Sequence, residues 1–568
     1  MSSDKTLRTI AQGTLRGSVA ANGAHVWRGV PFAAPPVGPL RWKAPRPAQP
    51  WQGELAALQN GNPCVQDLSL AHPFVDDDGD GLIGSEDCLY LNVFAPADAS
   101  PADALPVMYF IHGGGNVGGH NAGTTYDGAP LARRHRVVVV TVNYRLGMLG
   151  WFMHPALIEP GASADDRSGN WGTLDIIHGL EWVRDNIAAF GGNPGNVTVF
   201  GESAGGVNVF SLLVSPRAKG LFHRAIAQSG GLLCDSLASA CNYSDDVVAG
   251  SANSSREVVN RLLVRTGEAA DRNAAKALQD TLSDTEIAGK LRRLTPRELI
   301  EIVNPERARL YSAPRVLADG AVISEQAWLD AFRAGRFHRV PVITGTNRDE
   351  RRLYQFMESR WRKTFRETPG DYVRYAHYGT LAWKHRAVDD VASAMWEAGH
   401  REIYAYRFDW DEQNVVVGNL DISLAVGAAH SVELPFVFGT PGGLSVPLGD
   451  PEAPARRALS ESMMSYWAAH AQTGAPGRGQ DGREIEWTAW HEPDGEAKLL
   501  LLDTPADGGV RMSSERVTHA SLKQAVLEES RFETPGLHAQ LYRGLFSGSA
   551  FRDEEYRRLG GKPKESAE

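Results

Sequence analysis

The segment that most constrains the fold is 197–206, which reads Val-Thr-Val-Phe-Gly-Glu-Ser-Ala-Gly-Gly. Its β-branched and aromatic residues predict a buried strand, and the G-x-S-x-G that follows predicts a sharp turn into a helix. Gly201 and Gly205 flank Ser203, at positions where a Cβ would collide with neighbouring backbone. The pattern is typical of a nucleophile elbow that presents Ser203 to a substrate. A surface loop can match G-x-S-x-G by chance, so the interpretation depends on finding partners for Ser203.

A second glycine-rich segment supplies candidate partners. Residues 106–115 read Pro-Val-Met-Tyr-Phe-Ile-His-Gly-Gly-Gly, a buried-strand pattern that ends in H-G-G-G. Attack by a serine on a carbonyl creates an oxyanion, which backbone N–H groups can stabilise. We expect the amides of Gly114, Gly115 and Ala204 to be these donors. A plain glycine-rich turn after a core strand is the alternative.

A serine hydroxyl is a poor nucleophile without a general base, and the chain offers 17 histidines. Where an elbow of this kind is used, the triad order along the chain is Ser, then Asp or Glu, then His on a late loop. His430 fits this order best, because it lies in a small-residue loop downstream of the strand-like segment 403–410. His120 and His178 precede the elbow and His223 follows it closely, so all three fit a late loop badly.

The acid of the triad is expected between Ser203 and His430, after another strand. Residues 340–350 read Val-Pro-Val-Ile-Thr-Gly-Thr-Asn-Arg-Asp-Glu, a strand followed by a polar loop with two carboxylates. The acid fixes the tautomer of the imidazole and stabilises the imidazolium, which a carboxylate of either length can do. On these grounds Asp349 and Glu350 are equally suitable.

With these motifs the chain resembles a known family, the type B carboxylesterases, which are the cholinesterase-like branch of the α/β-hydrolases. In relatives the acid is the Glu of a G-x-N-x-x-E element, which matches Glu350 and leaves Asp349 as the fallback. The family histidine precedes an E-x-x-F-V-F-G-like run, which matches His430. The resemblance extends from about residue 29 to 439 and includes the segments Gly-Val-Pro-Phe at 29–32, Ser-Glu-Asp-Cys-Leu-Tyr-Leu-Asn-Val at 85–93, Asn-Tyr-Arg at 143–145, Phe-Gly-Gly-Asn-Pro at 190–194 and the elbow at 200–206.

The fold that this resemblance implies is the α/β-hydrolase fold, with a large, mostly parallel central sheet flanked by helices and with helical insertions around an active-site gorge. The triad spans residues 203–430, so we predict one catalytic domain over 1–550. A charged, helix-prone stretch at about 254–303 is expected to be a helical insertion, and 551–568 a charged, mobile tail. Predicted strands are 136–143, 196–200 and 225–228, and predicted helices are 174–190 and 207–214.

The expected activity is hydrolysis of a carboxylic ester through an acyl-enzyme on Ser203, with no cofactor for catalysis. One alternative is a specialist esterase for a single bulky or polyfunctional ester, such as a toxin, a lactone or a polyester fragment. Another is a binding protein, because some relatives have lost the nucleophile. Glu202 is expected to be a buried electrostatic modulator. Ser229 matches a second serine near the histidine in relatives, although an ordinary serine at a strand end is an equal alternative.

Two departures from the family pattern bear on specificity. Relatives carry an aromatic residue after the oxyanion glycines, and this chain has Asn116. It makes the acyl site more polar or turns outward to solvent. A choline site needs a Trp in the loop 65–87, since a quaternary ammonium binds over an aromatic face. That loop contains none, which disfavours a cholinesterase.

The same loop contains the spacing of an EF-hand-type calcium site. In Asp-Asp-Asp-Gly-Asp-Gly-Leu-Ile-Gly-Ser-Glu-Asp at 76–87, carboxylates fall at positions one, three and five, and a Gly at six. Position twelve is Asp in place of Glu, and no flanking helices are evident, so a solvated acidic loop is the alternative. A structural calcium ion would be held by Asp76, Asp78, Asp80, the Leu82 carbonyl and Asp87.

The chain has four cysteines, in two sequence-local pairs, Cys64 with Cys88 and Cys234 with Cys241. The two loop disulfides of the family occupy similar places, so these pairs are tentative disulfides. The N-terminus shows no apolar signal segment. We expect a cytoplasmic protein if Met1 is the native start, and a secreted or periplasmic one if a leader has been removed. The resemblance also implies an ion pair between Glu86 and Arg41.

Composition excludes several partners. With 42% hydrophobic residues and no apolar run of transmembrane length, the chain is expected to be globular and not to span a membrane. Its net charge of −10 and the lack of a basic patch argue against nucleic acid. The expected partner is a small-molecule ester.

Overall fold

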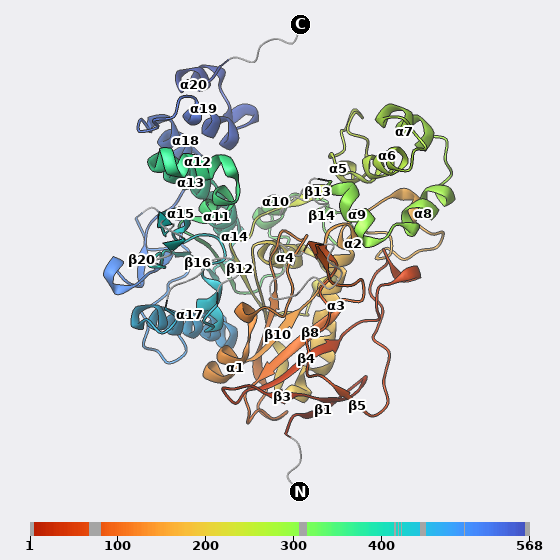
Figure 1. The fold of residues 1–568 in the computed structure, drawn as a ribbon. Coiled ribbons are helices and arrows are strands. Elements are labelled where there is room, and N and C mark those ends of the chain that lie inside the picture. Colours follow the sequence, from red (N-terminus) through yellow and green to blue (C-terminus); the bar gives the residue numbers. More distant parts are fainter. Residues whose placement is uncertain are drawn as a thin grey trace. The chain divides into compact units, whose positions relative to one another are not determined.

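The computed structural model describes residues 5–67, 81–305, 315–413, 416–417, 420–421, 423–442, 450–493 and 495–562. The chain divides into two compact units, coloured along the sequence in Figure 1. The first comprises Met1–Pro341 and Ala468–Ala475, and the second Val342–Trp467 and Pro476–Glu568. The single domain over 1–550 stays a prediction.

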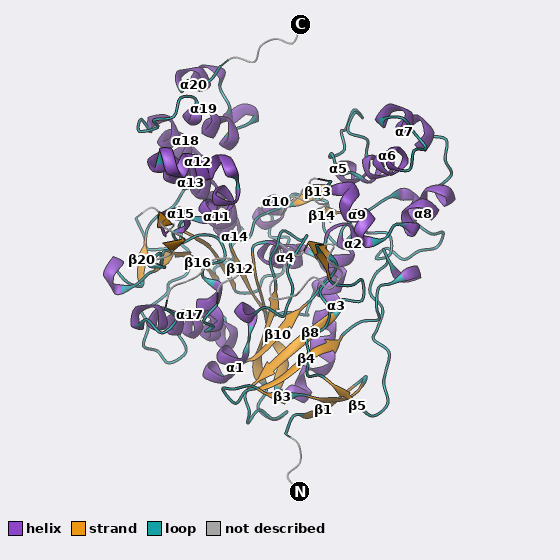
Figure 2. Ribbon diagram, viewed as in Figure 1, coloured by secondary structure: helices purple, strands orange, loops and turns teal. Residues whose placement is uncertain are grey.

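The strands of the first unit form a twisted sheet in the order β12-β11-β9-β10-β8-β4-β3. Strands β12, β11, β9 and β10 are parallel, and β8, β4 and β3 continue the sheet in antiparallel pairs. Figure 2 shows β10, β8 and β4 side by side. The described strands of the whole first unit, including those of its smaller sheets, are β1 (Leu7–Ile10), β2 (Gly13–Arg16), β3 (Ser18–Val19), β4 (His25–Pro31), β5 (Glu54–Ala56), β6 (Gln66–Asp67), β7 (Leu82–Ile83), β8 (Tyr90–Ala95), β9 (Leu105–Ile111), β10 (Val138–Val142), β11 (Gly192–Glu202), β12 (Arg224–Gln228), β13 (Cys234–Ser236) and β14 (Val316–Ala318).

Crossover helices join the parallel strands of this sheet. Helix α3 lies between β10 and β11 in sequence, and α4 lies between β11 and β12 and packs on both. Every residue of β10 is buried, as a strand covered on both faces requires. The predicted strands and crossover helices are confirmed. The helices of this unit are α1 (Ala129–His135), α2 (Gly147–Gly150), α3 (Trp171–Asn186), α4 (Ala204–Val214), α5 (Leu237–Cys241), α6 (Ser255–Arg265), α7 (Arg272–Gln279), α8 (Asp284–Arg293), α9 (Pro296–Val303) and α10 (Trp328–Arg333).

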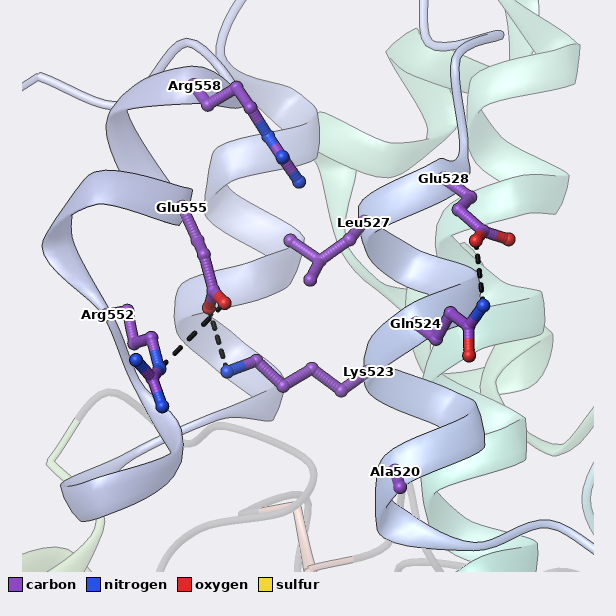
Figure 3. Close-up of a pocket in the computed structure, with 8 residues that line it drawn as sticks. All are labelled: Ala520, Lys523, Gln524, Leu527, Glu528, Arg552, Glu555 and Arg558. Carbon is purple, nitrogen blue, oxygen red and sulfur yellow. Dashed lines mark hydrogen bonds and ion pairs between the residues drawn. The ribbon is translucent and has the colours of Figure 1, made fainter.

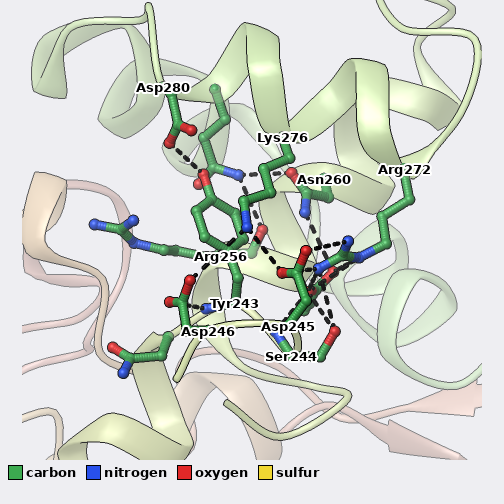
Figure 4. Close-up of polar contacts among 12 residues, drawn as sticks. Tyr243, Ser244, Asp245, Asp246, Arg256, Asn260, Arg272, Lys276 and Asp280 are labelled. Carbon is green, nitrogen blue, oxygen red and sulfur yellow. Dashed lines mark hydrogen bonds and ion pairs between the residues drawn. The ribbon is translucent and has the colours of Figure 1, made fainter. Parts of the chain in front are cut away.

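The stretch 254–303 is helical, formed by α6 to α9, and a polar network ties it to the loop that precedes it (Figure 4). Arg272 of α7 pairs with Asp245 of the loop at 2.7 Å and with Glu257 of α6 at 2.5 Å. The Tyr243 hydroxyl donates to Asp280 over 2.8 Å. Hydrogen bonds from Arg272, Ser244 and Asn260 outweigh burial and lower the pKa of Glu257 to about 2, so the network is ionised at neutral pH.

The second unit contains three parallel strands, β15, β16 and β19, with β20 antiparallel at the edge. Its strands are β15 (Val342–Asn347), β16 (Ile403–Phe408), β17 (Val416–Val417), β18 (Leu420–Asp421), β19 (Leu499–Leu502) and β20 (Arg511–Ser513). Its helices are α11 (Glu350–Met357), α12 (Ser359–Glu367), α13 (Pro369–Lys384), α14 (Asp390–Glu397), α15 (Ser423–Val426), α16 (Leu434–Phe438), α17 (Pro454–Thr473, which continues into the first unit), α18 (His519–Glu528), α19 (Leu537–Leu545) and α20 (Asp553–Arg558).

The described end of the chain packs as short helices. Tyr556 of α20 joins a hydrophobic cluster with Val526 of α18 and Tyr542 of α19. A helix therefore occupies part of the 551–568 segment that the sequence suggested would be mobile; its mobility stays a prediction. Across the described ranges, no helix combines the length and apolar character needed to cross a membrane.

Candidate active site

Ser203 sits at a strained turn between β11 and α4. Its φ and ψ are 58° and −121°, a conformation that a non-glycine residue rarely adopts and that costs about 1–3 kcal/mol. Between Val197 and Val214, all of which the structure describes, Ser203 is the one residue that is not buried. The turn therefore lifts one hydroxyl out of an otherwise buried strand and helix, as the elbow interpretation predicts.

The glycines around Ser203 are required by close backbone packing. A Cβ added at Gly205 would lie 2.0 Å from the Ile111 carbonyl oxygen, and one at Gly201 would lie 2.6 Å from the Gly205 backbone. Both contacts are far inside van der Waals distance, so neither position accepts a larger residue without backbone movement. The backbone of the elbow thus packs closely against the end of β9.

The H-G-G-G loop follows β9 and lies beside the elbow. A Cβ added at Gly113 would come within 3.0 Å of the Ser203 Cβ and 2.8 Å of the Glu202 carbonyl oxygen. Gly114 and Gly115 have φ values of 107° and 65°, which glycine adopts without strain. Amides of Val117 and Gly118 close the loop by donating to the Gly114 carbonyl.

Asn116 ends this loop and is 7% exposed, with φ at 59°. Its Oδ1 accepts a hydrogen bond from Asn208 Nδ2 at 3.0 Å and from the Tyr144 hydroxyl at 3.3 Å. The alternative that Asn116 turns outward to solvent is therefore wrong. The side chain instead links the glycine loop to α4, the helix that Ser203 precedes.

His112, also in the loop, has a structural role. Its ring stacks on Tyr144 with centroids 4.4 Å apart, and burial lowers its pKa to about 3. The Tyr144 hydroxyl donates to the His112 carbonyl at 2.6 Å. A neutral His112, packed and bonded in this way, helps to support the glycine loop.

Two further predicted residues lie in the first unit near the elbow. Glu202 is 1% exposed, which confirms that it is buried. Ser229 is fully buried with φ at 47°, and its Oγ has no hydrogen-bond partner among the described residues. The Ser203 amide donates to the carbonyl of Gln228, the residue before Ser229, so the two serines belong to adjoining strand ends.

The predicted acid and base meet in the second unit. His430 Nδ1 and Glu350 Oε2 form a hydrogen bond, and both side chains are buried. The other carboxylate oxygen, Oε1, accepts from the Thr346 hydroxyl at 2.9 Å and from the Asn347 amide at 2.8 Å. The Thr346 hydroxyl and the Asn347 backbone amide therefore fix the Glu350 carboxylate, which bonds the imidazole at Nδ1.

Asp349, the fallback acid, has a different role. Its carboxylate pairs with Arg352 at 2.9 Å and accepts from the Ala428 amide at 3.1 Å, while its own amide donates to the Ala428 carbonyl. It anchors the loop that carries His430. Asn347 Nδ2 adds a second anchor, because it donates to the Ala429 carbonyl at 2.7 Å.

The sequence did not single out Thr346 or Asn347, although both belong to the G-x-N-x-x-E element. Sequence analysis also missed two aromatic residues, Tyr354 and Trp383, whose rings pack against His430. Tyr354 follows Glu350 by four residues on α11, a spacing that places both on one helix face. That spacing was the available signal; Trp383 had none.

The cysteine predictions are not confirmed, since all four cysteines are free thiols in the structure. Cys64 accepts a hydrogen bond from the Leu146 amide at 3.3 Å, and Cys241 contacts Met153. A hydrogen bond with Cys64, together with burial, raises the pKa of the Cys88 thiol. The ion pair between Arg41 and Glu86 is confirmed, with Arg41 Nη2 2.5 Å from Glu86 Oε2.

The calcium prediction falls mostly outside the described residues, because Asp76, Asp78 and Asp80 are not among them. Of the remaining proposed ligands, Leu82 lies in β7 and the Asp87 amide donates to the Ser85 hydroxyl. The site stays a prediction. In the second unit, a separate acidic group brings together Glu412, Asp503 and Asp507.

A surface hollow of about 610 Å³ lies in the second unit between α18 and α20 (Figure 3). Its side chains are largely paired with one another: Lys523 contacts Glu555 at 2.8 Å, and Gln524 donates to Glu528. No proposed catalytic residue lines it. It is therefore not the candidate active site.

The structure thus brings Ser203 together with the glycine loop in the first unit, and Glu350 together with His430 in the second. Chemically, the first arrangement can present a nucleophile beside backbone N–H groups. The second can hold an imidazole in one tautomer, with Nδ1 as the donor to the carboxylate and Nε2 available as a base.

Comparisons with known proteins place this site in context. The family model described as "Carboxylesterase family" matches residues 4–376 and 358–519. The para-nitrobenzyl esterase of Bacillus subtilis (strain 168) is 34% identical over 87% of this chain and 94% of its own. The cocaine esterase of Homo sapiens is 32% identical, over 83% and 84% of the two chains.

Solved structures give the same result. A PNB esterase structure covers 92% of this chain and 99% of its own, with 30% identity and a TM-score of 0.65. A carboxylesterase of Geobacillus stearothermophilus covers 89% and 97%, with 28% identity and a TM-score of 0.66. The predicted α/β-hydrolase fold is therefore confirmed.

Proposed function

The chain belongs to the carboxylesterase family and is a carboxylic ester hydrolase, and from this premise we propose that it works through an acyl-enzyme on Ser203. The observation that carries this proposal is the strained, partly exposed elbow at Ser203 combined with the Glu350–His430 pair. The first supplies the candidate nucleophile, and the second supplies the candidate acid and base.

In the proposed mechanism His430 Nε2 removes the Ser203 proton as Oγ attacks the ester carbonyl carbon. The amides of Gly114, Gly115 and Ala204 stabilise the tetrahedral oxyanion. The intermediate collapses when the C–O bond to the alcohol breaks, and His430 gives its proton to the departing alkoxide. Water, activated by the same imidazole, then releases the acid from Ser203.

The carboxylate of Glu350 keeps the proton on Nδ1 throughout. Its contacts with Thr346 and Asn347 support this role, since a carboxylate held by two other donors can bond the imidazole without moving itself. Glu202, buried beside the nucleophile, is proposed to modulate the local field. Ser229 is proposed to support the site from the neighbouring strand end.

The specialist alternative rests on Asn116 and on the acidic loop 76–87. The Asn116 side chain is already bonded to Asn208 and Tyr144, and the structure describes only 81–87 of the loop. The binding-protein alternative requires a lost nucleophile, and Ser203 is present. A carboxylesterase that accepts several small esters is thus the better supported function.

The test is hydrolysis of p-nitrophenyl esters from acetyl to palmitoyl by the wild type and by Ser203→Ala. We expect turnover of the short esters and loss of nearly all of it in the variant, because triad residues act as a unit. Ser211→Ala is the matched control, since Ser211 is a buried serine on α4 whose hydroxyl donates to the Asn208 carbonyl. Equal rates for Ser203→Ala and the wild type would reject the proposal.

A further inference from the structure

One hydrogen bond does not fix an imidazole. The Glu350 carboxylate bonds His430 at Nδ1, and contacts on the faces of the ring govern the direction in which Nε2 points. Catalysis requires the reacting groups to be held in a narrow range of geometries, and a misplacement of about 1 Å can cost about 100-fold in rate. Packing against the faces of the ring is one way to hold it in that range.

Two aromatic rings supply contacts of the right kind. The Tyr354 ring lies with its centroid 5.2 Å from that of His430, at an interplanar angle of 43°. The Trp383 ring lies at 5.1 Å and 46°. The two aromatic rings also stack on each other at 5.9 Å and 28°, so the three rings form a closed cluster. These distances lie in the range of favourable aromatic pairs.

The cluster is not simply part of the hydrophobic core. Tyr354 and Trp383 are both partly exposed, whereas His430 is 5% exposed. Both rings keep part of their surface exposed and still pack on a buried histidine. This packing points to a role at the histidine rather than in the core. Two charged groups contact the cluster: Glu350 bonds the histidine, and the Arg351 guanidinium lies over the Tyr354 ring at 5.5 Å.

Two closely packed helices, α11 and α13, carry the aromatic residues of the cluster. Tyr354 shares α11 with Glu350, so one helix delivers both the hydrogen-bond acceptor and one ring. Helix α13, which carries Trp383, packs closely on α11: a Cβ at Gly379 would lie 2.9 Å from the Arg351 side chain, and the Arg351 amide donates to the Thr380 hydroxyl at 3.2 Å.

A π-helical turn at His385–Asp389 begins two residues after Trp383. Lys384 and Asp389 are five residues apart, which in an α-helix would place them about 140° apart around the axis. The π turn brings them together, and Lys384 Nζ lies 2.8 Å from both carboxylate oxygens, with each side chain 1% exposed. The ion pair stabilises the π-helical turn and therefore also the end of α13, where Trp383 lies.

We propose that Tyr354 and Trp383 are positioning residues that hold the His430 ring in its catalytic orientation by aromatic packing. The inference rests on the proposed function, because it assigns the two rings a role in the chemistry of His430. They act on the ring of the base and not on the ester. The turnover number should therefore depend on them, and the KM should not.

The experiment measures kcat and KM with p-nitrophenyl butyrate for Trp383→Leu, Trp383→Phe, Tyr354→Leu and Tyr354→Phe, beside the wild type. Each Leu variant is expected to lower kcat by about 10- to 100-fold with KM within about twofold. Each Phe variant keeps a ring and is expected to recover most of the lost rate. A merely structural role would not give this recovery together with an unchanged KM.

Two reference variants separate the possible failures. Trp396→Leu removes another partly exposed tryptophan, on α14, and is expected to keep the wild-type kcat. His430→Ala reports on the proposed function: if it keeps the wild-type rate, that function and this inference both fall. If His430→Ala loses activity while the Leu variants keep theirs, or change KM alone, only the positioning role is overturned. Melting curves of all variants exclude loss of folding as the cause.

Discussion

The choice of Glu350 over Asp349 as the acid can be tested with two single-atom changes. In Glu350→Gln, the side-chain oxygen can still accept from Thr346 and Asn347, as Oε1 does now at 2.9 and 2.8 Å. The amide nitrogen then faces His430 Nδ1. Because two donors cannot face each other, the imidazole proton must move to Nε2, the nitrogen that has to accept the Ser203 proton.

The expected loss follows from that tautomer. A triad with the wrong imidazole tautomer loses about 10⁴-fold in kcat, which corresponds to about 5.5 kcal/mol of transition-state stabilisation. The hydrogen bonds of the folded state are kept in number, so stability should change by less than about 1 kcal/mol. Activity falls steeply while the melting temperature hardly moves.

Asp349→Asn is the matched control and should show the opposite pattern. It keeps an oxygen for the Ala428 amide but loses the charge that pairs with Arg352, so about 1–3 kcal/mol of stability is at stake. Its kcat should stay within about tenfold of the wild type. The assay is kcat for p-nitrophenyl butyrate with parallel thermal melts. A nearly active Glu350→Gln, or an Asp349→Asn that loses about 10³-fold, would refute the reasoning.

Three further predictions concern stability. Asp389→Ala should destabilise the protein by about 3–5 kcal/mol in denaturant titrations by leaving the Lys384 ammonium buried and unpaired, and the double change Asp389→Leu with Lys384→Met should recover most of it. Burial and the nearby carboxylates raise the pKa of Asp503 from 3.8 to about 6, so the folded state binds the extra proton and stability should fall as pH rises from about 4 to about 6. Asp503→Asn should flatten that dependence and add about 1–2 kcal/mol at pH 7 after allowance for solvent screening; an unchanged pH profile of the melting temperature would contradict this. The calcium prediction for 76–87 requires EDTA to lower the melting temperature and added calcium to restore it, and an unchanged melting temperature rejects it.

Local sequence patterns predicted the parts of the site that depend on local backbone. The elbow at Ser203 and the glycine loop could be found because each needs glycines at fixed offsets from a strand end. The structure gives both the expected backbone conformations. The strands and crossover helices around them were equally accessible, since a continuous apolar run such as β10 is typical of a buried parallel strand.

Features that depend on packing between distant segments could not be predicted this way. Asp349 and Glu350 are adjacent and chemically alike, so only the family resemblance separated them before the His430 contact was seen. The inward direction of the Asn116 side chain depends on its hydrogen bond with Asn208, which lies on α4. Trp383 reaches His430 through the packing of α13 on α11, which no local pattern specifies.

The central claim, an acyl-enzyme on Ser203, is tested most directly by labelling with a fluorophosphonate probe. Mass spectrometry of the intact protein and of its peptides would count the adducts and locate them. The account predicts one adduct, on the peptide that contains Ser203, absent from Ser203→Ala and formed far more slowly by His430→Ala, because the base activates the hydroxyl. An adduct on another residue, or labelling of Ser203→Ala at the wild-type rate, would contradict it.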